Sequence, residues 1–245
     1  MIRKSLPFLL LALAFTVTMF SCKKPDDRPA PPQAEQEYYP LEKGKWVLYE
    51  VDSTVWDDTF CVERFYHYQV MHRVADTFTD AQGRPSYRVE TFIREKVQDD
   101  WKSHRVMYAT NTKVTLEMVY DQLRFIKLVF PIHEGDSWKG NNYILTMDPE
   151  NEFYDDWDYR YKNVGQSYNT GHKVFDNTIT VEQVDEAVGD PEVFEEEFAS
   201  RTSGREVYAS GVGMVYREYI RWTYDPATTK CRKGVGVVMR AVDHN

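Results

Sequence analysis

Apolar and polar residues alternate along most of the chain from Trp46 onward, and a period of two is the pattern of β-strands. β-Branched and aromatic residues are frequent in these runs, as strands favour. The runs that predict strands are WVLYEVDSTVW (46–56), FYHYQVMHRV (65–74), SYRVETFIREKV (86–97), HRVMYAT (104–110), KVTLEMVY (113–120), RFIKLVF (124–130), YILTM (143–147), YRYKNVG (159–165), KVFDNTITVEQV (173–184), REVYASGVGMVYREYIRWTYD (205–225) and GVGVVMRAV (234–242).

Turn-forming residues separate these runs, so neighbouring strands are expected to pair as antiparallel hairpins. Paired glycines at 211 and 213 and at 234 and 236 interrupt strand patterns, which predicts bulges or sharp bends in a strongly curved sheet. The expected fold is mainly β, a curved antiparallel half-barrel, barrel or sandwich in one domain, residues 38–245. The one helix candidate is Glu192–Ser200.

Three stretches carry a resemblance: YYPLEKGKWVLYEVDS (38–53), FPIHEGDSWKG (130–140) and YASGVGMVYRE (208–218). Together they resemble uncharacterised envelope lipoproteins of Bacteroidetes-type bacteria. The resemblance implies a highly curved antiparallel sheet like that of lipoprotein carrier folds. It implies no activity and no catalytic residue.

The N-terminal segment looks like a lipoprotein signal peptide. Arg3 and Lys4 precede an uncharged apolar run, which is shorter than a comfortable membrane-spanning helix and ends at Ser21 and Cys22. We therefore expect cleavage after residue 21, acylation of Cys22 and a lipid anchor in a membrane. An ordinary secretory peptide and a spanning helix are the weaker alternatives.

Residues 22–37 are rich in proline and charge and have no apolar periodicity, which predicts a solvated, disordered tether. Lys23 and Lys24 follow the cysteine in place of the aspartate that commonly retains lipoproteins in the inner membrane. The expected address is therefore the outer membrane. Whether the domain faces the periplasm or the cell surface stays open.

The net charge of −9 becomes −11 once Arg3 and Lys4 leave with the signal peptide. A charge of this sign repels nucleic acid, so no nucleic-acid partner is expected. After acylation of Cys22 only Cys61 and Cys231 remain, an even pair in an oxidising compartment. A disulfide between them is possible, although the sequence does not measure their separation.

The sequence lacks several common catalytic and cofactor-binding motifs. Both glycine pairs lack the third glycine of a dinucleotide-binding turn, and the chain contains no GxSxG nucleophile elbow and no CxxC pair. His67 and His72 lie five residues apart in a strand pattern, so their side chains are expected on opposite faces. No cofactor is expected.

An acidic segment between two strands is the best candidate for ion chemistry. Calcium prefers oxygen-rich loops, but the glycine of an EF-hand loop is missing from its place, and acidic loops are usually only solvated. Glu150 and Asp156 could alternatively form the acid–base pair of a polysaccharide hydrolase. The six carboxylates are those of Asp148, Glu150, Glu152, Asp155, Asp156 and Asp158.

Aromatic residues make up 15% of the chain, and they suit either a packed core or a pocket for sugars and apolar molecules. Tyr154, Trp157, Tyr159 and Tyr161 are candidate ligand-binding residues because they lie in or beside the acidic segment. The leading hypothesis is a non-enzymatic lipoprotein that binds a hydrophobic molecule, a glycan or an envelope protein. The alternatives are the hydrolase and a purely structural subunit of an envelope complex.

Overall fold

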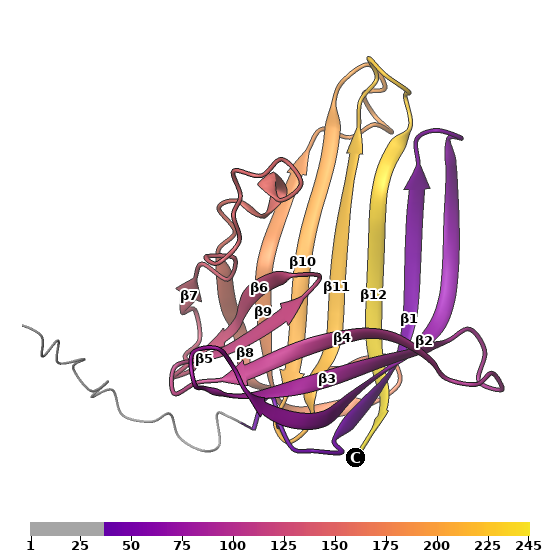
Figure 1. The fold of residues 1–245 in the computed structure, drawn as a ribbon. Helices are drawn as coiled ribbons and strands as arrows, with labels where there is room; N and C mark the ends of the chain where they lie inside the picture. The colour runs from indigo at the N-terminus through magenta and orange to yellow at the C-terminus, as the bar shows by residue number, and fades with distance from the viewer. Residues whose placement is uncertain (1–36) are drawn as a thin grey trace, which may run out of the picture.

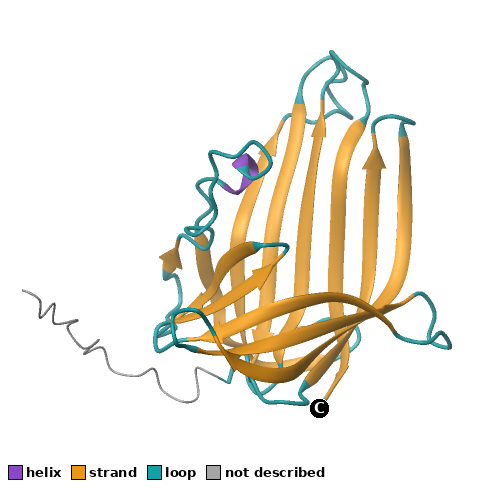
Figure 2. Cartoon of the chain, in the orientation of Figure 1, coloured by secondary structure: helices purple, strands orange, loops and turns teal. Residues whose placement is uncertain are grey.

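The computed structural model describes residues 37–245, which form one antiparallel sheet of twelve strands. Figure 2 shows that strands dominate this part of the chain. The strands are β1 (Trp46–Asp57), β2 (Val62–Thr79), β3 (Pro85–Arg94), β4 (Lys102–Asn111), β5 (Thr115–Tyr120), β6 (Leu123–Val129), β7 (Ser137–Trp138), β8 (Tyr159–Asn169), β9 (Val174–Val188), β10 (Ala199–Ala209), β11 (Gly213–Tyr224) and β12 (Arg232–His244).

The strands follow one another across the sheet in the order β6-β5-β4-β3-β2-β1-β12-β11-β10-β9-β8-β7. Every neighbouring pair except β1 and β12 is consecutive in sequence, so the sheet is two runs of hairpins joined along the first and last strands. β1 and β12 pair over most of their length, from Val47 opposite His244 to Trp56 opposite Gly234. The predicted antiparallel sheet is confirmed.

The sheet is so strongly curved that it nearly closes. In Figure 1, strands β8–β12, β1 and β2 form a tall wall, and β3–β6 cross in front of its lower part. The edge strand β6 thereby reaches the residues after β7, where the Ile126 amide donates to the Gly140 carbonyl at 2.8 Å. The Trp138 indole N–H also donates to the Ile126 carbonyl at 2.8 Å.

A tyrosine adds to this closure, which we call the seam. The Tyr161 hydroxyl of β8 accepts from the Val129 amide and donates to the Val129 carbonyl, both at 2.9 Å. The seam therefore consists of Ile126, Val129, Trp138, Gly140 and Tyr161. It turns a curved sheet into a barrel-shaped enclosure with an interior.

The core lies inside the lower part of this enclosure, because alternate side chains of each strand point inward. Tyr49 and Val51 of β1 are both 1% exposed and lie opposite Ala241 and Met239 of β12. The Tyr49 hydroxyl donates to the Met214 carbonyl at 2.7 Å, which satisfies its polar end. Each such buried apolar side chain contributes about 1.5–3 kcal/mol to folding.

Glycines occupy several turns and close approaches of the sheet. Gly44 and Gly135 both have positive φ, and each precedes a strand that contains or begins with tryptophan. At Gly234 the backbone of β11 comes so close that a Cβ would lie 2.1 Å from the Arg221 carbonyl oxygen. The register of β11 against β10 shifts between Val207 and Tyr208, close to the pair at 211 and 213, whereas β11 and β12 pair without a register shift at 234 and 236.

Two local predictions are wrong. Residues 143–147 form turns instead of a strand, with the Ile144 amide donating to the Asn141 carbonyl. Residues 192–198, in the helix candidate Glu192–Ser200, also form turns, and the last two residues of that candidate begin β10. Within residues 37–245 the only helical element is the 3-10 helix η1 (Glu152–Tyr154).

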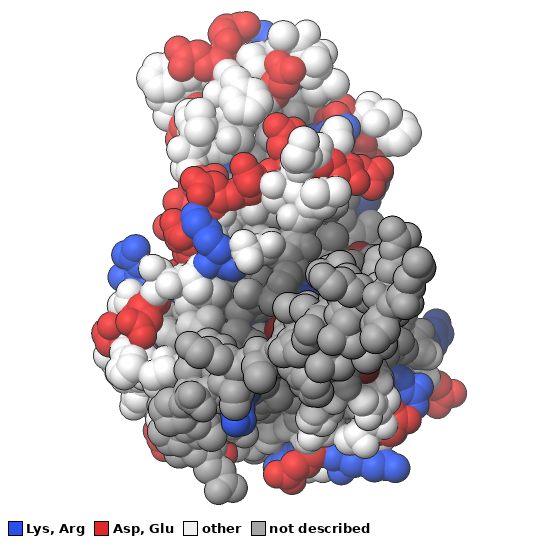
Figure 3. Space-filling view, turned by 60° about the vertical axis from the view of Figure 1, so that its left-hand side comes forward, with Lys and Arg blue, Asp and Glu red and all other residues white. Residues whose placement is uncertain are grey.

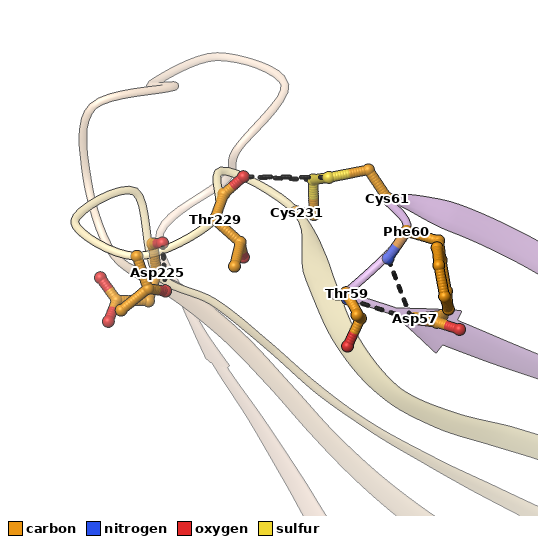
Figure 4. Close-up of a disulfide and its surroundings, with 8 residues drawn as sticks. Asp57, Thr59, Phe60, Cys61, Asp225, Thr229 and Cys231 are labelled. Atoms are coloured by element: carbon orange, nitrogen blue, oxygen red, sulfur yellow. Dashed lines mark hydrogen bonds between the residues drawn. A yellow bond between two sulfur atoms is a disulfide. The ribbon is translucent and has the colours of Figure 1, made fainter.

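Cys61 and Cys231 form a disulfide at the upper end of the wall, shown in Figure 4. Cys61 lies in the β1–β2 turn, where the Thr59 and Phe60 amides donate to the Asp57 carboxylate. Cys231 immediately precedes β12, and the two Cα atoms are 5.4 Å apart. The bond joins positions 170 residues apart in sequence.

The expected signal peptide (residues 1–21), the expected acylation site Cys22 and all but the last residue of the expected tether lie outside the described residues, so these stay predictions. Within residues 37–245, no helix is both long and apolar enough to cross a membrane.

Candidate functional site

A cavity of about 390 Å³ lies between the wall and the strands that cross in front of it. This volume falls within the range of small-molecule sites in proteins. Residues from both parts of the sheet line it, so the cavity exists only because the sheet curves back on itself. Its aliphatic lining includes Val51, Val70, Met107, Val237 and Met239.

Aromatic rings form one side of this cavity. Tyr120 and Phe125 stack with their centroids 4.6 Å apart, and Tyr154 meets Phe125 edge-on at 5.5 Å. Trp157 in turn packs edge-on against Tyr154 at 5.3 Å. The rings hold one another in place before any ligand arrives, which lowers the entropy lost on binding. Those that line the cavity are Tyr68, Tyr120, Phe125, Tyr154, Trp157, Tyr159 and Tyr219.

A buried cluster of charges lies beside these rings. Glu206 of β10 is 1% exposed, and its carboxylate accepts from Lys127 Nζ at 2.7 Å and from the Tyr208 hydroxyl at 2.6 Å. Arg217 of β11 lies opposite Glu206, with Nε 3.7 Å from the carboxylate. We call Lys127, Glu206, Tyr208 and Arg217 the charge cluster.

The charges of this cluster stabilise one another. Burial alone would raise the pKa of the Glu206 carboxyl, but the positive charges of Lys127 and Arg217 and the hydrogen bonds outweigh it. The net result is a pKa below the ordinary value, so Glu206 is ionised at neutral pH. Burial and the neighbouring Glu206 charge raise the pKa of the Tyr208 hydroxyl, which stays protonated and able to donate.

Two histidines that line the cavity are neutral at pH 7. Burial, followed by the charges of Arg217 and His104, lowers the pKa of His72 to about 3. Burial and the Arg105 charge lower the pKa of His104. His67 lies elsewhere, paired with Glu50 and Asp52 at 2.9 Å, so His67 and His72 point to opposite faces as predicted.

An ion pair marks where the cavity meets solvent. Arg105 and Asp121 both line the cavity and form an ion pair at 2.7 Å, and both side chains are more than half exposed. Because their charges cancel, this pair adds no net charge to the site.

The four aromatic residues singled out in the sequence lie in two different places in the structure. Tyr154, Trp157 and Tyr159 line the cavity. Tyr161 is fully buried, and its hydroxyl belongs to the seam. Three of the four candidates thus lie together at the cavity, whereas Tyr161 holds the seam closed.

The acidic segment does not assemble a metal site. Within residues 37–245 no group of three or more His, Cys, Asp or Glu side chains is placed to hold a metal ion. Lys139 instead pairs with Asp156 at 2.6 Å and Asp158 at 3.0 Å. Asp155 accepts from the Thr146 hydroxyl, and Asp148 accepts from the Glu150 amide. The structure thus shows this segment as an exposed loop in which Lys139 pairs with two of the carboxylates, and calcium binding by the candidates Asp148, Glu150, Glu152, Asp155, Asp156 and Asp158 stays an untested prediction.

Acidic side chains are prominent on the outer surface. Figure 3 shows them outnumbering basic ones over the upper part of the face drawn, in keeping with the net charge of −9. The interior differs, because the charge cluster contains two cations and one carboxylate.

Sequence reasoning did not find the charge cluster. Lys127, Glu206 and Arg217 each stand in a strand pattern where a charged residue normally faces solvent. Only the register, which sets Glu206 opposite Arg217 and turns both inward, brings them together. The one available signal is that Glu206 and Arg217 share the inward face of their strands with Tyr208 and Tyr219.

No protein-family model matches this chain, and no curated protein matches it. Among solved structures, the chain is similar to an exported protein with a YmcC-like fold from Bacteroides fragilis. The identity is 10% and the TM-score 0.41, over 84% of this chain and 98% of the other.

Proposed function

We propose that this protein is a lipid-anchored envelope protein, not an enzyme, that binds a small hydrophobic molecule inside its curved sheet. The observation that carries this proposal is the cavity of about 390 Å³ with its aromatic and aliphatic lining. Such a lining suits the burial of an apolar body, and its rings are already packed against one another.

The proposed location is supported by the N-terminal sequence and by the disulfide. Structural disulfides persist in oxidising compartments such as the periplasm and the cell surface. The apolar leader that ends at Cys22 supports acylation there, and Lys23 and Lys24 in place of a retaining aspartate support an outer-membrane address. If this is right, Cys22→Ser moves the protein from the membrane fraction to the soluble fraction and abolishes its labelling with radioactive palmitate.

The geometry favours ligand binding over the two alternatives. For the hydrolase, Asp156 is 89% exposed and paired with Lys139, so it lies in no water-excluding cleft where a carboxylate pair could act. A purely structural subunit needs no internal cavity of this size. Neither a glycan nor a protein partner accounts as well for a site enclosed by the sheet.

Native mass spectrometry of the protein purified from membranes in mild detergent tests the proposal. We expect the wild-type protein to carry a bound small molecule, which extraction and fragmentation would then identify. Met107 lines the cavity, while its neighbour Val106 on β4 is 42% exposed and does not line it.

These neighbours provide a matched pair of variants. Met107→Trp should fill the cavity and remove the bound mass, whereas Val106→Trp should retain it. A wild-type protein with no bound mass, and no uptake of offered fatty acids, alcohols or phospholipids, would refute the proposal.

A further inference from the structure

The charge cluster leaves one positive charge inside the molecule. Lys127 and Arg217 are both cationic and share the single carboxylate of Glu206, and Lys127 is the nearer, at 2.7 Å against 3.7 Å. Lys127 therefore neutralises most of Glu206, and Arg217 is the cation whose charge remains uncompensated.

The other charged groups around the cavity do not supply the missing anion. Arg105 and Asp121 pair with each other at 2.7 Å, and His72 and His104 are neutral at pH 7. An unpaired charge in an enclosed site costs free energy, so such a site favours a ligand of the opposite sign.

Arg217 is also placed to make a new contact. Its side chain is 30% exposed although it lies among buried groups, because it lines the cavity. A guanidinium has five N–H donors, whereas the contact of Arg217 with a carboxylate within residues 37–245 is the one to Glu206, and its 3.7 Å is longer than a hydrogen bond. A carboxylate matches the planar fork of a guanidinium and can accept two of its N–H groups at once.

From this geometry, and resting on the proposed function, we infer that the ligand is an organic monocarboxylate whose carboxylate pairs with Arg217 while its apolar body lies against the aromatic rings. The rings lie next to the cation, since Arg217 is 5.8 Å from the Tyr120 centroid and Tyr120 stacks on Phe125. The site thus joins one anion-binding group to an apolar surface.

Calorimetry with decanoate and decanol tests this inference, because the two probes share one hydrocarbon body and differ in the carboxylate. The wild-type protein should bind decanoate at least tenfold more tightly than decanol. Arg217→Gln should remove most of this preference and leave decanol binding within about twofold. Arg217→Lys, which keeps the charge, should retain part of it.

A matched control comes from the same strand and face. Arg221 lies four residues after Arg217, stacks on Phe153 at 3.9 Å and does not line the cavity. Arg221→Gln should leave the preference for decanoate unchanged. Decanol binding reports in each variant whether the cavity has kept its shape.

The outcomes separate the two proposals. Equal affinity for both probes, or a preference that survives Arg217→Gln, overturns the inference and leaves the proposed function standing. Binding of neither probe contradicts the proposed function and the inference together. A decanoate preference that Arg217→Gln abolishes and Arg221→Gln preserves supports both.

Discussion

Glu206 is a carboxylate in an apolar interior, and its stability depends on its partners. With 1% of its surface exposed, it is too deeply buried for water to compensate a lost ion pair. Its contacts with Lys127 and Tyr208 come from two different strands, so the charge cluster also fixes how β6 faces β10.

Glu206→Gln should lower the free energy of unfolding by about 3–5 kcal/mol, because it leaves the buried Lys127 without a counter-charge. Urea unfolding at pH 7 measures this. The control is Glu218→Gln, whose partly exposed carboxylate pairs with Arg205 at 3.3 Å and should cost below about 1 kcal/mol. Adding Lys127→Met to Glu206→Gln should recover part of the lost free energy. Equal losses for Glu206→Gln and Glu218→Gln would contradict this account.

His72 makes the stability of the folded chain depend on pH. Its pKa is about 3 in the folded chain and near 6.5 in the unfolded chain, so between these values only the unfolded chain takes up the proton. The free energy of unfolding therefore loses nothing to His72 above about pH 6.5, and it decreases as the pH falls from about 6.5 towards 3.

His72→Phe should remove this loss. Between pH 7 and pH 5 the wild-type protein should lose about 1 to 2 kcal/mol more than the variant, measured by urea unfolding at both values. His67, whose pKa its hydrogen bond with Asp52 raises, is common to both proteins and cancels in the comparison. Parallel pH profiles for the two proteins would show that His72 does not titrate in this way.

At the scale of elements, the glycine on which neighbouring backbone closes most tightly is Gly234. A Cβ there would lie 2.1 Å from the Arg221 carbonyl oxygen and 2.6 Å from the Trp222 Cα. Backbone atoms cannot give way as side chains can. β11 and β12 would have to separate where Trp222 lies opposite Gly234.

Gly234→Ala should therefore destabilise the protein by about 2–3 kcal/mol, by overpacking. Gly236→Ala is the matched variant, since its Cβ would meet the Trp56 ring at 3.2 Å, a side chain that can shift. Thermal unfolding by circular dichroism should rank the two in that order. A larger loss at Gly236 would show that ring packing, not backbone approach, limits this hairpin.

Strand existence could be predicted from the sequence, because alternation reports burial on one face directly. The misassigned segments show the limit of that reasoning. Residues 143–147 alternate like a strand, but Leu145 and Met147 are 69% and 90% exposed and turn hydrogen bonds replace strand pairing. Residues 192–198 expose Val193, Phe194 and Phe198, so no buried face supports a helix there.

At the scale of the whole molecule, the cavity could not be predicted. Tyr154, Trp157 and Tyr159 were found because they are close in sequence, whereas Lys127, Glu206 and Arg217 meet only through curvature and register. Curvature depends on backbone positions such as Gly234 and on contacts at the seam. Neither is encoded in a local pattern of apolar residues.

The disulfide between Cys61 and Cys231 joins residues that are 170 positions apart in the sequence. Restricting so long a loop lowers the entropy of the unfolded chain. Cys61→Ala with Cys231→Ala should lower the free energy of unfolding by about 2–5 kcal/mol in urea, and reductant should have the same effect on the wild-type protein. An unchanged urea midpoint in the double variant would mean that other contacts hold the β1–β2 turn next to the start of β12.

The seam has a consequence for how copies of this protein behave at high concentration. A wide sheet normally ends in two rows of unpaired amides and carbonyls, which can template pairing with another chain. Here β6 faces Gly140, β7 has only two residues, and the pairing of β8 is irregular between Lys162 and Gln166. The two borders of the sheet thus meet at the seam, and the edge strand β7 is too short to offer a long row of free backbone groups, which opposes edge-to-edge aggregation of neighbouring molecules.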